Sequence, residues 1–162
     1  NYDTDSSDLF AWYQQLVAES LGKKGKGILP VISNMPKDNH SLMQLYLDGP
    51  KNSFYTFFDV IEKKSPKINN SLILSSHNYL KNKSFFDIKI AQKKATQNVF
   101  KNKKIPFRSF NVINRSENSL GEIFTFFMLE TILLGHALKV NPFDQPSVEL
   151  IKVETNKILK KN

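Results

Sequence analysis

The chain has 162 residues, no cysteine and a formal net charge of +8 at pH 7. Hydrophobic residues make up 40% of it, including 13 Phe, which is enough for a packed core and excludes a wholly disordered chain. The lack of cysteine excludes a disulfide framework and a thiolate zinc site.

The positive charge is carried almost entirely by lysines that are scattered in small groups along the chain. Only Arg108 and Arg115 could make the bidentate base contacts that arginine makes best. We therefore expect a solvated basic surface and no nucleic-acid partner. A basic RNA- or DNA-binding domain stays open as an alternative, to be tested by the salt dependence of binding.

The first fifty residues predict a helix, a strand and a second helix. Residues 8–21 carry apolar side chains at helical spacing, and Gly22 ends that helix. Residues 27–33 form a short apolar run that predicts a buried strand. Asp38 can cap a helix over residues 39–47, which a Gly-Pro pair stops.

The middle of the chain predicts two strands, a loop and a helix. Residues 53–60 are rich in aromatic side chains and predict a strand, which a polar loop over residues 62–70 follows. Residues 72–74 predict another short strand. A helix then begins at Asn82 or Ser84 and ends near residue 102.

The last third predicts a strand and two helices. Residues 105–113 alternate as a strand does, and Ser119 caps a long helix to about residue 138, with Glu122 completing a capping box. After a polar turn, Pro146 suits the first position of a last helix that reaches about residue 160.

These elements define an α/β fold class. Strands that alternate with helices favour a mostly parallel sheet with helices on both faces, which makes three layers. The longest apolar run, residues 123–138, is interrupted by polar residues and is shorter than the roughly 20 residues that span a bilayer. We expect it to be a buried helix, and we expect no membrane partner.

A specific motif occurs near the C-terminus. Residues 141–152, Asn-Pro-Phe-Asp-Gln-Pro-Ser-Val-Glu-Leu-Ile-Lys, resemble the C-terminal signature of the phosphoglucose isomerases (glucose-6-phosphate isomerases). In that signature a Phe-Asp-Gln turn opens a helix that carries Val-Glu and, three residues later, Lys. Ser147 departs from the pattern, which has Gly or Ala there. The matching positions are Gly135, Phe143, Asp144, Gln145, Val148, Glu149 and Lys152.

Two further blocks occur in the order expected of the same family. Residues 15–20 resemble its Gln-x-x-x-Glu-Ser helix, and residues 38–45 resemble the block that supplies its active-site histidine. The resemblance thus runs from about residue 8 to the end. It implies a sugar-isomerase (SIS-type) domain over residues 1–162, acting without a cofactor or metal on a sugar phosphate, in a cytoplasmic homodimer.

The resemblance also implies a role for five residues. Glu19 would be the catalytic base, His40 would open the sugar ring from across the subunit interface, and Lys152 would assist ring opening. Gln15 and Gln145 would bind substrate oxygens. The residue types fit these roles, since Glu19 lies at the negative end of its predicted helix, which makes a carboxylate more basic. His40 would lie at the positive end of its own helix, which favours a neutral imidazole.

Parts of the family pattern are missing from this chain. The Ser/Thr-rich loop that binds the substrate phosphate and the Gly-Gly-Arg block that stabilises the enediolate do not occur. We therefore expect the C-terminal portion of an isomerase without its N-terminal domain, nearly inactive by itself. No signal peptide is expected from residues 1–7. A sugar-phosphate-binding module without catalysis stays open as an alternative.

The lysine-rich loop Gly22–Gly27 invites comparison with a phosphate-binding loop. It lacks the final Ser or Thr and does not connect a strand to a helix, so we reject that interpretation.

Overall fold

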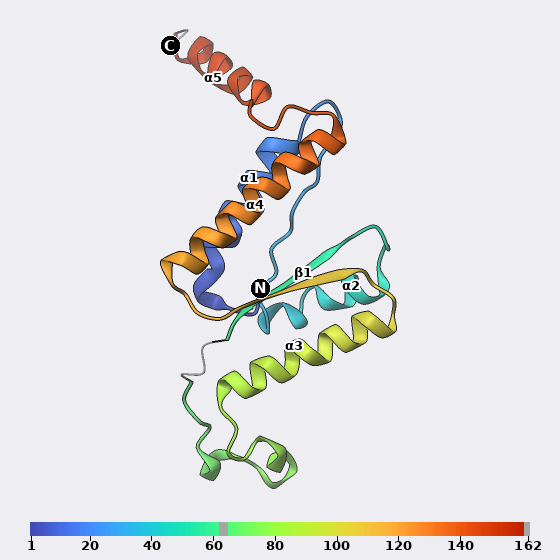
Figure 1. Cartoon of the computed structure of the whole chain (residues 1–162), viewed down its shortest axis with the longest axis vertical. Coiled ribbons are helices and arrows are strands. Elements are labelled where there is room, and N and C mark those ends of the chain that lie inside the picture. The colour runs from blue at the N-terminus through green and yellow to red at the C-terminus, as the bar shows by residue number, and fades with distance from the viewer. Residues whose placement is uncertain (62–64, 161–162) are drawn as a thin grey trace. The chain divides into compact units, whose positions relative to one another are not determined.

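The computed structural model describes residues 1–61 and 65–160, and it forms two compact units (Figure 1). Unit 1 comprises Asn1–Asp8 and Ser33–Leu120, and unit 2 comprises Leu9–Ile32 and Gly121–Asn162. Each unit has its own cluster of buried apolar side chains.

Unit 1 is built on a β-α-β arrangement. Strands β1 (Tyr55–Val60) and β2 (Phe107–Val112) pair in parallel, with Tyr55 opposite Phe107 and Val60 opposite Val112. Parallel strands need a crossover connection, which here contains helix α3 (Phe85–Asn102) (Figure 1). Ser84 caps α3 and forms a reciprocal capping box with Asp87.

Aromatic side chains fill the core between α3 and the strands. Phe100 of α3 is 1% exposed, and its ring meets those of Phe57 and Tyr55 edge to face, at centroid distances of 5.3 and 5.0 Å. This T-shaped geometry is the one that aromatic quadrupoles prefer. Shorter helices complete the unit: the 3₁₀ turns η1 (Thr4–Ser6), η2 (Lys37–Asn39), η3 (Asn70–Leu72) and η4 (Ser75–Leu80), and helix α2 (Met43–Asp48).

A buried polar cluster ties α3 to both strands. Lys93 donates to the carboxylate of Asp59 on β1 and to the amide oxygen of Asn111 on β2. Asp59 and Asn111 are partners in the strand register. Because Lys93 and Asp59 are almost completely buried, each needs the other to offset its desolvation.

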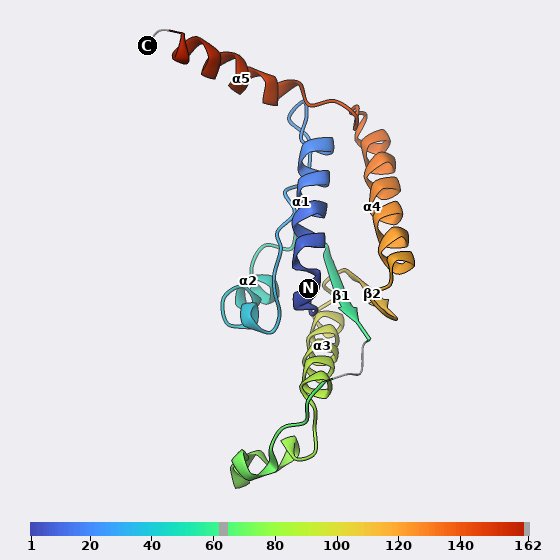
Figure 2. The same ribbon diagram turned by 90° about the vertical axis from the view of Figure 1, so that its left-hand side faces the viewer.

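Unit 2 consists of three helices. Helices α1 (Ser7–Leu21) and α4 (Glu117–Leu138) run side by side in the same direction, as Figures 1 and 2 show. Trp12 packs edge to face on Phe124, and Tyr13 stacks on Phe127 at 4.0 Å. Near the C-terminal ends of both helices, a further cluster buries Val17, Leu21 and Val140.

Helix α4 is not the buried helix that we expected. It has 22 residues, of which only Phe127, Thr131 and Gly135 are buried. By length and composition alone it could cross a membrane, a criterion that core helices of soluble proteins also meet. Its inner face contacts α1, where Tyr13 donates a hydrogen bond of 3.0 Å to Glu130.

The last helix, α5 (Pro146–Leu159), has no buried residue. Its large apolar side chains are exposed: Val148, Leu150, Ile151, Val153, Ile158 and Leu159.

The expected α/β class is confirmed, although the sheet of the described residues has two strands. The strands at residues 53–60 and 105–113 and the helices at 8–21, 84–102 and 146–160 are confirmed. The strand predicted at 27–33 is wrong: the segment pairs with no described strand, and Leu29 is 78% exposed.

Three other predictions need correction. The strand at 72–74 is wrong, because η3 occupies its start and Leu72 is 79% exposed. Ser119 does not cap α4; Ser116 does, accepting a hydrogen bond from the Ser119 backbone N–H. In the loop predicted at 62–70, residues 62–64 lie outside the described residues, and Lys67 makes an isolated bridge to Ser84.

Candidate active site

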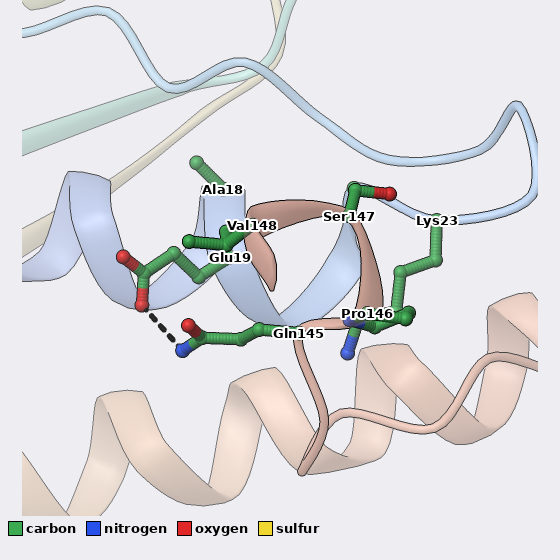
Figure 3. Close-up of a pocket in the computed structure, with 8 residues that line it drawn as sticks. Ala18, Glu19, Lys23, Gln145, Pro146, Ser147 and Val148 are labelled. Carbon is green, nitrogen blue, oxygen red and sulfur yellow. Dashed lines mark hydrogen bonds between the residues drawn. The ribbon is translucent and has the colours of Figure 1, made fainter. Parts of the chain in front are cut away.

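Glu19 lies in the last turn of α1, as the sequence predicted, and its side chain is half buried. Each of its carboxylate oxygens accepts a hydrogen bond from a side-chain amide. Gln15 Nε2 donates to Oε1 at 3.1 Å from one turn earlier on the same helix. Gln145 Nε2 donates to Oε2 at 2.7 Å from a position 126 residues away in the chain (Figure 3). The two amides together fix the orientation of the carboxylate plane.

The turn after α4 brings Gln145 to this place. Val140 N–H donates to Gly135 O at 3.0 Å and closes the end of the helix. Pro142 then packs on Gly135, where an added Cβ would lie only 3.1 Å from the proline ring. Glycine therefore favours the close approach of the turn to α4, because any larger residue would make the proline ring shift by a few tenths of an ångström. Gln145 follows as the residue before α5.

Glu19 and Gln145 line a pocket of about 240 Å³. Figure 3 shows the Glu19 carboxylate and the Gln145 amide facing each other at its wall. Such a pocket offers one carboxylate able to accept a proton, that of Glu19, and one neutral side-chain amide able to donate hydrogen bonds, that of Gln145. The lining residues are Ala18, Glu19, Gly22, Lys23, Gln145, Pro146, Ser147 and Val148.

Lys152 lies on α5 and is not among the residues that line the pocket. Its side chain is 66% exposed and forms an ion pair of 2.6 Å with Glu149, three residues earlier. An exposed pair of this kind contributes little to stability, so the ammonium group can leave it at small cost.

His40 lies in unit 1 and is exposed, and its predicted position at a helix N-terminus is wrong. It is the C-terminal cap of η2, and α2 begins only at Met43. The Asp38 carboxylate accepts instead from Asn34 N–H and from Ser41 Oγ. The hydrogen bond from Asn34 holds the pKa of Asp38 below its usual value.

Sequence reasoning missed Lys23, which also lines the pocket. Its side chain is 9% exposed and forms an ion pair of 2.9 Å with Asp144, the residue before Gln145. The hydrogen bond from Lys23 lowers the pKa of the Asp144 carboxyl. The signal available was the position of Lys23, two residues after the helix that carries Glu19, but the surrounding lysines looked like an ordinary solvated loop.

Comparison with known proteins gives consistent results. No protein-family model matches the chain. Among curated proteins, it is 39% identical to the glucose-6-phosphate isomerase of Mycoplasmopsis pulmonis, covering 99% of this chain and 38% of that protein. It is 33% identical to the glucose-6-phosphate isomerase of Methanocaldococcus jannaschii, covering 85% of this chain and 34% of that protein.

Solved structures agree in fold. A hypothetical protein from Thermus thermophilus matches with a TM-score of 0.86 and 31% identity, covering 98% of this chain and 40% of that one. A glucose-6-phosphate isomerase from Chlamydia trachomatis matches with a TM-score of 0.75 over 98% of this chain and 33% of that one. At 18% identity, this second match shows the fold alone.

The α/β fold is shared with the solved structures, and the named relatives match this chain over 85% to 99% of its length. The chain belongs to the glucose-6-phosphate isomerase family. It spans between 31% and 39% of the length of the curated relatives, which is consistent with the C-terminal portion that residues 141–152 indicated.

Proposed function

We propose that this chain supplies the proton-transfer base for the reversible isomerisation of glucose 6-phosphate and fructose 6-phosphate. The observation that carries the proposal is the Glu19 carboxylate in the wall of a pocket, hydrogen-bonded by the amide of Gln145, which also lines the pocket, and by the amide of Gln15, one helix turn earlier. The named relatives supply the substrate class.

In the open-chain sugar, the Glu19 carboxylate takes a proton from one of carbons 1 and 2 and returns it to the other through an enediolate. Oxidation at one carbon balances reduction at its neighbour, so the reaction needs no external oxidant or redox cofactor. Gln15 and Gln145 keep the carboxylate oriented and bind substrate oxygens when the sugar enters.

Ring opening precedes this step. We assign it to His40, acting in the site of a partner subunit, with the Lys152 ammonium group assisting. The chain is then one C-terminal SIS-type domain over residues 1–162 of a cytoplasmic homodimer. An N-terminal domain would bind the phosphate and stabilise the enediolate.

By itself the chain should be nearly inactive. Losing one group that stabilises a developing oxyanion costs about 3 to 4 kcal/mol, on the order of a hundredfold or more in rate. Measurable turnover of fructose 6-phosphate by the purified chain would contradict this expectation.

The test uses the complete enzyme, meaning residues 1–162 joined to the N-terminal domain that its relatives carry. Glu19→Gln should abolish both turnover and the exchange of sugar C1 and C2 hydrogens with solvent deuterium, followed by NMR. Glu122→Gln, the same change at an exposed site on α4, is the matched control and should retain both. Full activity of Glu19→Gln would refute the proposal. A wild-type enzyme that binds fructose 6-phosphate without turnover would favour a sugar-phosphate-binding module.

A further inference from the structure

Two of the three lysines in the Gly22–Gly27 loop, Lys23 and Lys26, contact the C-terminal end of α4 and the turn that follows it. Lys26 Nζ donates to Leu138 O, the last residue of α4, at 2.7 Å. Lys23 Nζ donates to Asn141 O, three residues further on, and pairs with the Asp144 carboxylate. A cation near the C-terminal end of a helix also stabilises its dipole.

The backbone conformation of the loop positions these lysine side chains. Gly27 has a φ of +129°, and an added Cβ would lie 2.8 Å from Gly22 Cα. The two glycines thus let the loop fold back tightly on the end of α1, where Lys23 N–H donates to Leu21 O at 2.9 Å. Lys23 therefore leaves the helix in a fixed direction.

Lys23 is the better buried of the two ends of its ion pair. At 9% exposure its ammonium group depends on the Asn141 carbonyl and the Asp144 carboxylate for the hydrogen bonds that water would otherwise supply. The Asp144 carboxylate also accepts from Asn141 Nδ2 at 2.9 Å. The cation thus bridges both ends of the Asn141–Asp144 turn and fixes its geometry.

We propose that Lys23 is a positioning residue that, through Asp144, holds Gln145 against Glu19. Gln145 directly follows Asp144, and Glu19 lies four residues before Lys23. The Lys23–Asp144 ion pair therefore closes a small ring that includes the Gln145–Glu19 hydrogen bond. Figure 3 shows that hydrogen bond and the Lys23 side chain near it. This inference rests on the proposed role of Glu19 as the base. The loop would thus position an active-site side chain and would not bind phosphate.

The experiment measures kcat and KM for fructose 6-phosphate in the complete enzyme. Lys23→Met keeps the apolar stem and removes the cation, and it should lower kcat by about ten- to a hundredfold, because small displacements of a catalytic group have effects of that size. Lys23→Arg should restore most of the loss. Lys24→Met is the matched control: Lys24 is exposed, makes no side-chain hydrogen bond within the described residues, and should change neither constant.

Two further measurements distinguish the proposed positioning role of Lys23 from a purely structural role. Asp144→Asn should lower kcat as Lys23→Met does, and the double variant should be no worse than either, since both act through one ion pair. In thermal unfolding, the melting temperature of Lys23→Met should be close to that of Lys24→Met. If Lys23→Met does not fold, the loss of kcat in Asp144→Asn tests the inference instead. The Asp144 side chain is 52% exposed, so its replacement should be tolerated by the fold.

Failure of the inference differs from failure of the proposed function. If Glu19→Gln is inactive while Lys23→Met and Asp144→Asn match Lys24→Met, only the positioning role is refuted. Additive losses in the double variant would also refute it. If Glu19→Gln is active, the proposed function itself fails.

Discussion

Replacing Gln145 with alanine tests the geometry of the Glu19 carboxylate most directly. The substitution removes a hydrogen bond of 2.7 Å to Glu19 Oε2 and leaves Gln15 as the remaining amide donor, at 3.1 Å. Hydrogen bonds to charged groups contribute about 1.5–3 kcal/mol. Because the Gln145 side chain is exposed, we take the lower end, which corresponds to roughly a tenfold loss in rate.

The measurement is kcat/KM for fructose 6-phosphate in the complete enzyme, with Gln145→Glu as a second variant. Gln145→Glu keeps the side-chain length but places a second carboxylate beside Glu19, so it should be the more damaging of the two. Gln15→Ala should cost less than Gln145→Ala, because its hydrogen bond is longer and stays within one helix turn. Wild-type kcat/KM for Gln145→Ala would refute the reasoning.

Three further predictions concern stability and pH. Phe100→Ala removes a ring that is 1% exposed and touches three other rings, so it should lower the free energy of unfolding by about 3–5 kcal/mol in urea denaturation; a loss below about 1 kcal/mol would contradict the packing. Ser84→Ala should cost about 1 kcal/mol by the same assay through loss of the α3 cap, and an unchanged midpoint would contradict it. The folded pKa of Asp144 is lowered, so its contribution is complete above the unfolded value of 3.8 and is lost as the pH falls through the lower folded value. The protection factors of the Asn141, Phe143, Asp144 and Gln145 amides, which compare each exchange rate with the intrinsic rate at the same pH, should therefore fall only in that acidic range. Lys23→Met should weaken this pH dependence, because the hydrogen bond from Lys23 is the largest cause of the lowered pKa.

Local signals in the sequence predicted most of the helices and both strands. The aromatic run at residues 53–60 favours a strand, and Ser84 favours the start of a helix. Both preferences depend on residues close in the sequence, so they can be recognised without the tertiary structure. Residues 27–33 look equally apolar, but a strand needs a partner, and hydrophobicity alone does not supply one. For α4, Ser119 was the predicted cap, but Ser116, three residues earlier, takes that position.

In the candidate site, too, the features set by local sequence were predictable, and those set by tertiary contacts were not. Glu19 at the end of its helix followed from periodicity, whereas its contact with Gln145 joins residues 126 positions apart that no local pattern relates. The family resemblance named both residues but gave no reason for Lys23. Its role depends on a tertiary ion pair, and in the sequence it is one of several loop lysines.

The exposure of α5 bears on Lys152. A helix of 14 residues without tertiary packing is marginally stable in water, and α5 presents several large apolar side chains that nothing in the described part of the chain buries. A partner that covered those side chains would also restrict the direction of the Lys152 ammonium group. The two halves of the proposed reaction would then differ in their dependence on assembly. The proposed proton transfer at Glu19 would use contacts already made within one unit, whereas the proposed assistance from Lys152 would depend on the covering of α5.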